Sequence, residues 1–304
     1  MLIVMSKKNG GLRPFSFFCV SAVRSLVLIS VVSAFAASTF ARNLVWLDGI
    51  AVWKDASRKS PAKARTRNDL AMAYYGAGLA GYAIEGFKKA LSLNPDIAMI
   101  HSNIGFVYGK EGMLSDAVAH HEKAIELMPS FPGAHENLAI AYCAMKEFSL
   151  CINEFKTALS LLDRARTRHN LANAYRKAGM RKEAVLEFES LLRRHDLPVL
   201  HNDLGLVYAE GGEEGKARRE FSTAIEQDPS YQAPYVNMGF LYLGNGRLNE
   251  SLEMYSAAVG INPDEPLIHY HLFLLYGKMG DKEEARAHLE KFYKLKAKKG
   301  AGGS

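Results

Sequence analysis

The residues best suited to chemistry in this 304-residue sequence are amide and carboxylate side chains at a constant spacing. They stand five residues before each of seven regularly spaced tyrosines, and we call them the ladder. An amide both donates and accepts hydrogen bonds, so a row of amides can pair with the peptide groups of an extended chain of any sequence. The alternative is that this position is polar only because it faces water. The ladder consists of Asp69, Asn103, Asn137, Asn170, Asp203, Asn237 and His271.

A second row, two residues before the same tyrosines, is apolar, and we call it the stripe. An apolar stripe beside an amide ladder suits a peptide that lies along a groove and buries some of its side chains. The alternative is that the stripe packs against neighbouring structural elements. Its members are Met72, Phe106, Ile140, Leu206, Phe240 and Leu274, with Asn173 in the fourth place.

The segment around the fourth tyrosine is unusually polar. Such a cluster could hold an acidic side chain or a carboxylate of a partner, or it could be a solvated face. Its members are Arg166, His169, Asn170, Asn173, Arg176 and Lys177.

Patterns that mark catalytic or metal sites are missing from the sequence. It has no Gly-rich phosphate loop, no GxSxG and no HExxH. The strongest metal candidates are the pairs His120–His121 and His269–His271, but neighbours at these spacings point to different sides of a helix. We therefore predict no enzymatic activity, no cofactor and no metal.

Two of the three cysteines, Cys143 and Cys151, stand eight residues apart on what we expect to be two helices. Their spacing does not match a zinc site. A disulfide between them requires an oxidising compartment and Cα atoms within reach, which the sequence alone does not establish.

Positive charge is confined to the two ends of the chain. Of the formal net charge of +6, residues 1–41 contribute +4 and residues 291–304 contribute +5, which leaves −3 for the residues between them. A basic footprint on the central part is missing, so we predict no nucleic-acid partner.

Residues 15–41 form a stretch that is apolar or small apart from Arg24 and several serines, and Lys7, Lys8 and Arg13 precede it. We call residues 1–41 the leader. It fits a signal peptide that is cleaved after Ala36, or an uncleaved anchor over residues 20–41, long enough to cross a bilayer. Either interpretation places the rest of the chain outside the cytoplasm. The remaining alternative is a cytoplasmic protein with a buried apolar helix.

The tyrosines recur every 33 or 34 residues and set the phase for other positions. A small residue usually stands three before, an aliphatic residue four before, Ala nine after, an aromatic ring thirteen after, and Pro twenty-one after. The aliphatic, small and tyrosine positions share one face of a helix, and Pro cannot extend the helix before it. The tyrosines are Tyr74, Tyr108, Tyr142, Tyr175, Tyr208, Tyr242 and Tyr276.

This pattern resembles the tetratricopeptide repeat (TPR) family over about residues 64–297. The resemblance implies an all-α, right-handed superhelical solenoid of seven helix-turn-helix repeats, whose stacked hairpins bury together the apolar face that one hairpin cannot bury alone. It also implies a concave groove lined by the first helix of each hairpin, which would carry the ladder and the stripe. We expect the repeats at about 64–97, 98–131, 132–164, 165–197, 198–231, 232–265 and 266–297.

The ends of the array and two of its positions depart from the pattern. Trp53 and Pro61 stand where the aromatic ring and the Pro of a preceding repeat would fall. We therefore expect residues 42–63 to form a junction and a half-repeat helix that caps the first repeat. Residues 298–304 have the composition of a flexible tail. His121 replaces the aromatic ring of the second repeat, and Phe273 replaces a small residue, which should crowd the seventh.

Two narrower resemblances concern partners. The ladder is similar to the asparagine ladder in the TPR superhelix of O-linked N-acetylglucosamine transferases, which grips an extended peptide backbone. Chaperone-binding TPR domains use a carboxylate clamp with Lys one residue before the ladder position, and no Lys is present there, so we do not expect a partner of this class.

Residues 42–65 resemble the membrane-to-TPR junction of bacterial transmembrane-and-TPR O-mannosyltransferase-like proteins, without their further spans or acidic transferase loop.

From these observations we expect a non-catalytic scaffold that is extracytoplasmic, contacts the membrane through its N-terminal segment and binds an extended segment of a protein partner. The alternative is an accessory subunit of an envelope glycosylation or assembly complex.

Overall fold

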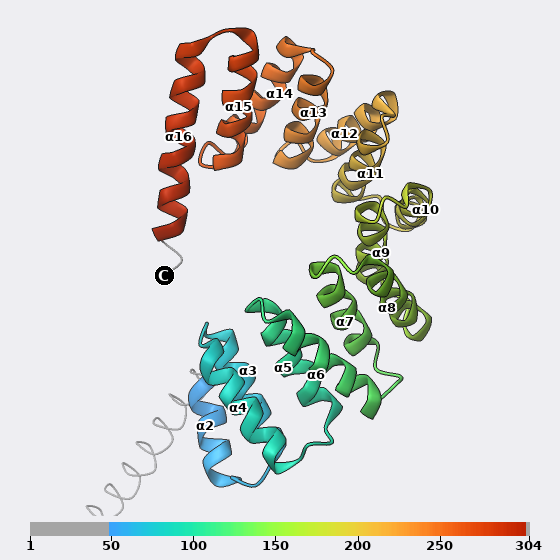
Figure 1. Ribbon diagram of the computed structural model, residues 1–304, viewed down its shortest axis with the longest axis vertical. Coiled ribbons are helices and arrows are strands. Elements are labelled where there is room, and N and C mark those ends of the chain that lie inside the picture. The colour runs from blue at the N-terminus through green and yellow to red at the C-terminus, as the bar shows by residue number, and fades with distance from the viewer. Residues whose placement is uncertain (1–48, 302–304) are drawn as a thin grey trace, which may run out of the picture. The chain divides into compact units, whose positions relative to one another are not determined.

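The computed structural model describes residues 49–301, and the leader, residues 42–48 and residues 302–304 lie outside this range. The described part consists of fifteen α-helices and has no strand (Figure 1). None of these helices is both long and apolar enough to cross a bilayer. The predicted all-α fold is therefore confirmed for this range.

After the single helix α2 (Gly49–Lys59), the helices follow one another as seven hairpins. Their bounds are α3 (Ala64–Gly76) and α4 (Ala80–Leu93), α5 (Ala98–Lys110) and α6 (Leu114–Leu127), α7 (Pro132–Ala144) and α8 (Phe148–Leu161), α9 (Ala165–Lys177) and α10 (Arg181–Leu192), α11 (Pro198–Glu210) and α12 (Glu214–Gln227), α13 (Gln232–Gly244) and α14 (Leu248–Ile261), and α15 (Pro266–Met279) and α16 (Lys282–Ala301).

The tight turn inside each hairpin explains the phase of the tyrosines. The carbonyl of each tyrosine accepts the N–H of the residue five positions later, for example Met113 to Tyr108 at 2.9 Å. This bond closes the helix end when the residue before the donor is left-handed, which favours glycine. Six hairpins have a glycine there with φ between 74° and 84°, and the third has Lys146 at φ 64°. Lys146 is the one non-glycine residue with positive φ between residues 49 and 301.

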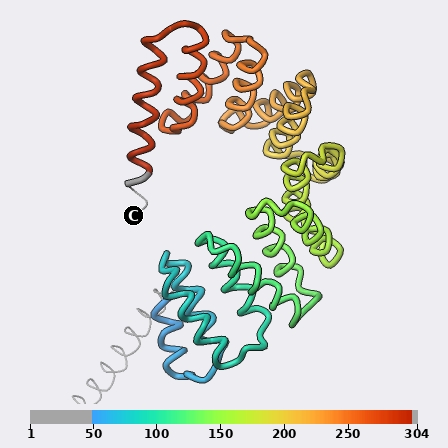
Figure 2. Tube along the Cα trace, in the orientation of Figure 1, coloured from blue at the N-terminus to red at the C-terminus, as the bar shows by residue number. Residues whose placement is uncertain are grey.

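The structure divides into two compact units, residues 1–103 and 104–304, and each is described by itself. In the second unit, from α7 onward, the two helices of each hairpin pack on each other, and from α6 onward each second helix packs on the first helix of the next hairpin, as the trace in Figure 2 shows. First helices also touch directly, because α11 contacts α13 and α13 contacts α15.

The core forms where an aromatic ring of the second helix lies on a small residue of the first. A Cβ added to Gly205 would lie 2.6 Å from the Phe221 ring, and one added to Gly239 would lie 2.8 Å from the Tyr255 ring. The nearest side chain to each of these glycines is therefore the aromatic ring of the second helix. The residue of that helix nine positions after the tyrosine lies farther away. The close approach of the ring makes glycine the residue that fits here.

In the first unit, α2 packs on α3, as expected of a capping helix. Trp53 on α2 is nevertheless 36% exposed, whereas Phe87 at the matching position of α4 is fully buried. Phe87 belongs to a second helix that packs along its own hairpin partner, and Trp53 has no such partner in the described range. Trp53 therefore has the spacing of the core aromatic residues without their burial.

The last hairpin differs from its prediction in the length of its second helix. Helix α16 continues to Ala301, past residue 298 where we predicted a flexible tail. Lys298, Lys299 and Ala301 are good helix formers, and Gly300 is the one unfavourable residue of this extension. Lys299 on this extension pairs with Glu265 at 2.8 Å. Phe273 is half-buried with its ring 5.9 Å from that of Tyr270, while Leu289 takes the place of the ring on α16.

Candidate functional site

The stripe lies at the surface of the first helices rather than in the core. Ile140 is 48% exposed and Phe240 is 60% exposed, and Met72 and Leu274 are exposed as well. Phe106 and Leu206 are half-buried. Phe240 also packs on the next hairpin, because its ring centroid lies 6.0 Å from that of His271 on α15. These four residues are therefore exposed to solvent, and for Phe240 exposure is combined with packing between hairpins.

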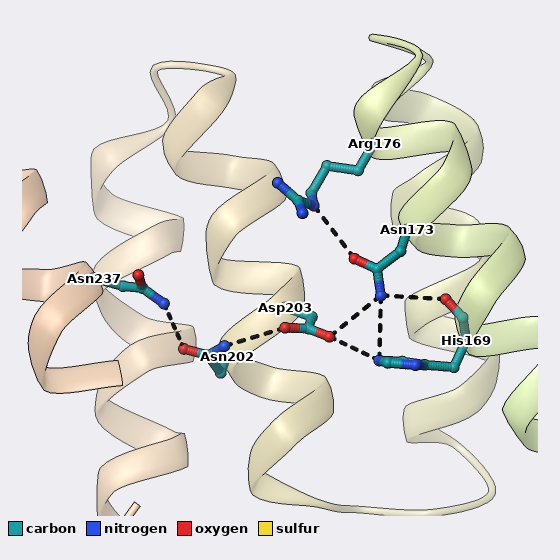
Figure 3. A network of polar contacts seen from close by, with 6 residues as sticks. All are labelled: His169, Asn173, Arg176, Asn202, Asp203 and Asn237. Carbon is teal, nitrogen blue, oxygen red and sulfur yellow. Dashed lines mark hydrogen bonds and ion pairs between the residues drawn. The ribbon is translucent and has the colours of Figure 1, made fainter. Parts of the chain in front are cut away.

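The ladder is only partly free to bind a partner, because two of its asparagines donate to a neighbouring hairpin. Asn103 Nδ2 donates to Asn68 Oδ1 at 2.9 Å, and Asn68 Nδ2 donates to Asp69 Oδ1 at 3.0 Å. The same chain of bonds recurs 134 residues later, where Asn237 donates to Asn202 at 2.8 Å and Asn202 donates to Asp203 at 3.1 Å (Figure 3). We call each three-residue chain a clasp.

Each clasp fixes a buried amide between two first helices. Asn68 and Asn202 stand one residue before the ladder and are buried. Because their oxygens accept from the next hairpin, their N–H groups must face the acidic ladder residue, which satisfies both ends of the amide. The prediction that the whole ladder serves a partner is thus wrong for one N–H each of Asn103 and Asn237, which join hairpins.

Asn137 and Asn170 differ from the other asparagines of the ladder. Both are half-buried, and neither side chain makes a hydrogen bond to any residue within 49–301. They lie on α7 and α9, between the two clasps in sequence. The capacity of the ladder to bind peptide groups is therefore concentrated on the third and fourth hairpins.

The polar cluster of the fourth hairpin contacts carboxylates of its own chain. Figure 3 shows Asp203 of α11 facing His169 and Asn173 of α9, at 2.7 and 3.4 Å. Arg176 donates to Asn173 Oδ1 at 3.4 Å and pairs with Glu210. These bonds tie α9 to α11.

The other arginine of this cluster joins α9 to the preceding hairpin. Arg166 lies 2.9 Å from Glu136, a buried carboxylate on α7 that also accepts from Thr167 at 3.2 Å. The arginines, His169 and Asn173 of the cluster thus bind carboxylates of this chain or one another, whereas Lys177 is exposed and Asn170 has no hydrogen bond within 49–301. The bonds of Arg166, His169, Asn173 and Arg176 form a network that connects the third, fourth and fifth hairpins.

A third row of polar residues, seven positions before each tyrosine, also makes recurrent hydrogen bonds and was not predicted. His101, His135 and His269 each place Nε2 2.9 to 3.0 Å from the carbonyl of the proline that precedes the hairpin. Where Asp163 and Asp196 replace that proline, the Asp side chain takes over as acceptor, from Arg168 and His201. The row was visible as a recurrent polar residue, Arg67, His101, His135, Arg168, His201, Tyr235 and His269.

The two candidate histidine pairs point in different directions, as predicted. His121 lies in the core, while His120 stacks on Tyr108 with ring centroids 5.5 Å apart. His269 bonds to Pro263 and His288, whereas His271 stacks on Tyr255. Within residues 49–301, no three His, Cys, Asp or Glu side chains are grouped to hold a metal ion.

Cys143 and Cys151 form a disulfide, with their Cα atoms 5.2 Å apart. The bond links the end of α7 to α8 across the turn that contains Lys146. Because the sequence gives no Cα distance, this pairing could only be found in the structure.

The comparisons with known proteins agree with this architecture. The family described as tetratricopeptide repeat matches residues 169–232, 233–265 and 268–299. A tetratricopeptide repeat protein of Parabacteroides merdae is 16% identical over 76% of this chain and 93% of that chain, with a TM-score of 0.68. Yeast Tom70 is 15% identical over 81% of this chain and 54% of that chain, with a TM-score of 0.60. Pseudomonas aeruginosa pilF is 18% identical over 66% and 97%, with a TM-score of 0.52. At these identities the likeness concerns the fold.

Proposed function

We propose that this chain, which is a tetratricopeptide repeat protein, is a non-catalytic scaffold that binds an extended segment of a protein partner along its first helices. The observation that carries the proposal is the exposed stripe beside Asn137 and Asn170, whose amides bond to no described residue. An extended segment presents peptide groups and side chains at regular intervals, so it can pair with amides and bury apolar side chains at once.

The third and fourth hairpins are the centre of the proposed surface. Ile140 is exposed one helical turn from Asn137 on α7, and Asn170 follows on α9. The clasps use N–H groups of Asn103 and Asn237, so the first and last parts of the ladder contribute less. The bonds of α9 to α7 and α11 hold the surface in place before a partner arrives, which lowers the entropy cost of binding.

The disulfide supports an extracytoplasmic location. Disulfides persist in oxidising compartments and are rare in the cytosol. The bond between Cys143 and Cys151 therefore fits the prediction from the leader, whose residues lie outside the described range. The state of this bond can be measured by alkylating free thiols in intact cells, denaturing and reducing the protein, and labelling the newly exposed thiols. We expect Cys143 and Cys151 to take up only the second label. Alkylation of both residues in the first step would argue for a reducing compartment.

The binding proposal is tested by selecting random dodecapeptides displayed on phage against the full-length chain. We expect the selected peptides to lose at least tenfold in affinity when Ile140 is changed to Asp or when Asn137 and Asn170 are changed to Ala. Leu186→Asp is the matched control, because Leu186 is 64% exposed on a second helix, α10. Peptides that respond equally to the control, or selection of no peptide, would contradict the proposal.

The alternative function as an accessory subunit of an envelope glycosylation or assembly complex depends on the motif at residues 42–65, of which residues 42–48 lie outside the described range. It stays a prediction, and co-purification with a multi-span transferase would support it.

A further inference from the structure

One core position of the second hairpin carries a polar ring. At this position the first, third, fourth, fifth and sixth hairpins bury Phe87, Phe155, Phe188, Phe221 and Tyr255. The second hairpin has His121, which is 2% exposed. Its ring is held against Gly105, because a Cβ added there would lie 2.8 Å from His121 Cε1.

His121 is buried without a hydrogen bond. Its Nδ1 is inaccessible and has no partner, and no described residue bonds to the ring. Burial, followed by the charge of His120, lowers the pKa of His121 to about 4, so the ring is neutral at pH 7. An unpaired buried polar group is unfavourable, and a Phe at this place would avoid that loss. Stability therefore does not explain the histidine.

A small hollow of about 140 Å³ adjoins this ring between α5, α6 and α7. Its walls include His121, Phe106 and Ile140 of the stripe, and Asn137 of the ladder. Gly105 and Gly109 leave the space open on the α5 side. The hollow thus belongs to the proposed binding surface and brings an unpaired imidazole, an amide without a hydrogen bond and two apolar side chains to one place.

We propose that this hollow receives a tyrosine side chain of the bound segment, with its ring between Phe106 and Ile140 and its hydroxyl bonded to His121. This inference rests on the proposed function, because the tyrosine belongs to the segment that lies on the first helices. Asn137 then pairs with a peptide group beside that tyrosine.

Size and hydrogen bonding select the tyrosine. A cavity of about 150 Å³ is known to hold one benzene ring, so a single six-membered ring fits the hollow. A hydroxyl donates and accepts, so it can pair with Nε2 of a neutral imidazole in either tautomer, whereas Nδ1 is inaccessible. A phenylalanine would leave His121 unpaired. A carboxylate would lose hydration in a largely apolar site, and the one Lys or Arg in its lining, Lys110, is exposed to solvent, so its charge offsets that loss only weakly.

The test uses p-cresol and toluene, the side-chain analogues of tyrosine and phenylalanine, titrated into the full-length chain. Nuclear magnetic resonance of the imidazole nitrogens of His121 reports the contact directly. We expect p-cresol to shift these signals and to bind about tenfold more tightly than toluene, as one added hydrogen bond implies. Equal binding of the two compounds, or no shift at His121, would overturn the inference.

Two variants separate a role in binding from a role in folding. His121→Phe should fold, because five other hairpins carry a ring there, and it should abolish the preference for p-cresol. His120→Phe is the matched control, since His120 does not line the hollow, and it should keep the preference. A preference that survives His121→Phe, or disappears in both variants, would refute the assignment.

The outcomes also distinguish this inference from the proposed function. Selected dodecapeptides that depend on Ile140 but show no enrichment of tyrosine, and no response to His121→Phe, would refute the inference and leave the scaffold proposal intact. Binding of p-cresol at His121 with no peptide selected would support the hollow as a site and contradict the scaffold proposal.

Discussion

The clasp around Asn202 predicts a specific loss of stability when this side chain is removed. Asn202→Ala deletes the bond from Asn237 at 2.8 Å and the bond to Asp203 at 3.1 Å. A neutral hydrogen bond contributes about 1 kcal/mol net, and one to a charged group about 1.5–3 kcal/mol. Asp203 keeps His169 and Asn173 as donors, which limits the second loss. We expect about 2–3 kcal/mol in total.

The loss should be local, so the assay must resolve single hairpins. Repeat arrays need not unfold in one cooperative step, and a global midpoint would mix the hairpins. Native-state hydrogen exchange measured on α11 and α13 reports the opening of the two helices that the clasp joins. The matched control is Asn170→Ala, because Asn170 is a half-buried asparagine of the same face without a side-chain bond. The Asn170→Ala variant should change the free energy of opening measured by hydrogen exchange on α11 and α13 by less than about 0.5 kcal/mol.

A double-mutant cycle isolates the bond itself. If Asn202 and Asn237 interact as the structure shows, their substitutions should couple by about 1 kcal/mol, so that the double variant loses less than the sum of the single variants. Equal effects of Asn202→Ala and Asn170→Ala on α13, or additive effects in the cycle, would refute the assignment of the clasp as a link between hairpins.

Two further predictions concern buried groups whose chemistry depends on conditions. Between pH 6.5 and about 4 the unfolded chain takes up a proton that buried His121 does not accept, so stability should fall by about 3 kcal/mol as the pH falls through this window. His121→Phe should remove that part of the fall when the free energy of opening of α6 is measured by hydrogen exchange at pH 7 and pH 4, and identical pH dependence would contradict the burial of a neutral ring. Replacing Cys143 and Cys151 by Ser should cost about 2–3 kcal/mol in exchange protection of α7 and α8 under oxidising conditions. The difference should vanish when both proteins are reduced, and a difference that persists would mean that the serines themselves perturb the hairpin.

The all-α fold could be predicted from the sequence because its signals are local. The tyrosines, the small residues and the prolines each act within one hairpin, so their spacing alone indicates two helices and a turn. His121 was recognised as a departure in the same way. The exposure of Trp53 was not predicted, because it depends on how many helices cover α2. The end of α16 at Ala301 was not predicted either, because the composition of residues 298–304 suits a flexible tail as well as a helix end.

The site was less predictable because its bonds connect different hairpins. Asn68 and Asn103 are 35 residues apart, and the sequence does not show that one donates to the other. The same holds for Asp203, which was predicted to face a partner and instead accepts bonds from α9. The unpaired state of His121 also depends on which atoms surround it. Such facts follow from how hairpins stack, and periodicity does not contain that geometry.

The measurement that tests the central claim most directly is site-specific photocrosslinking in cells that produce the full-length chain. A benzophenone side chain is placed at Ile140 or Phe240 on the stripe and, as a control, at Leu186 on α10. If the first helices bind an extended partner segment, both stripe positions should yield the same protein adduct, mapped to one short unstructured segment, and Leu186 should not. Adducts of equal yield at Leu186, or none at the stripe positions, would contradict the account.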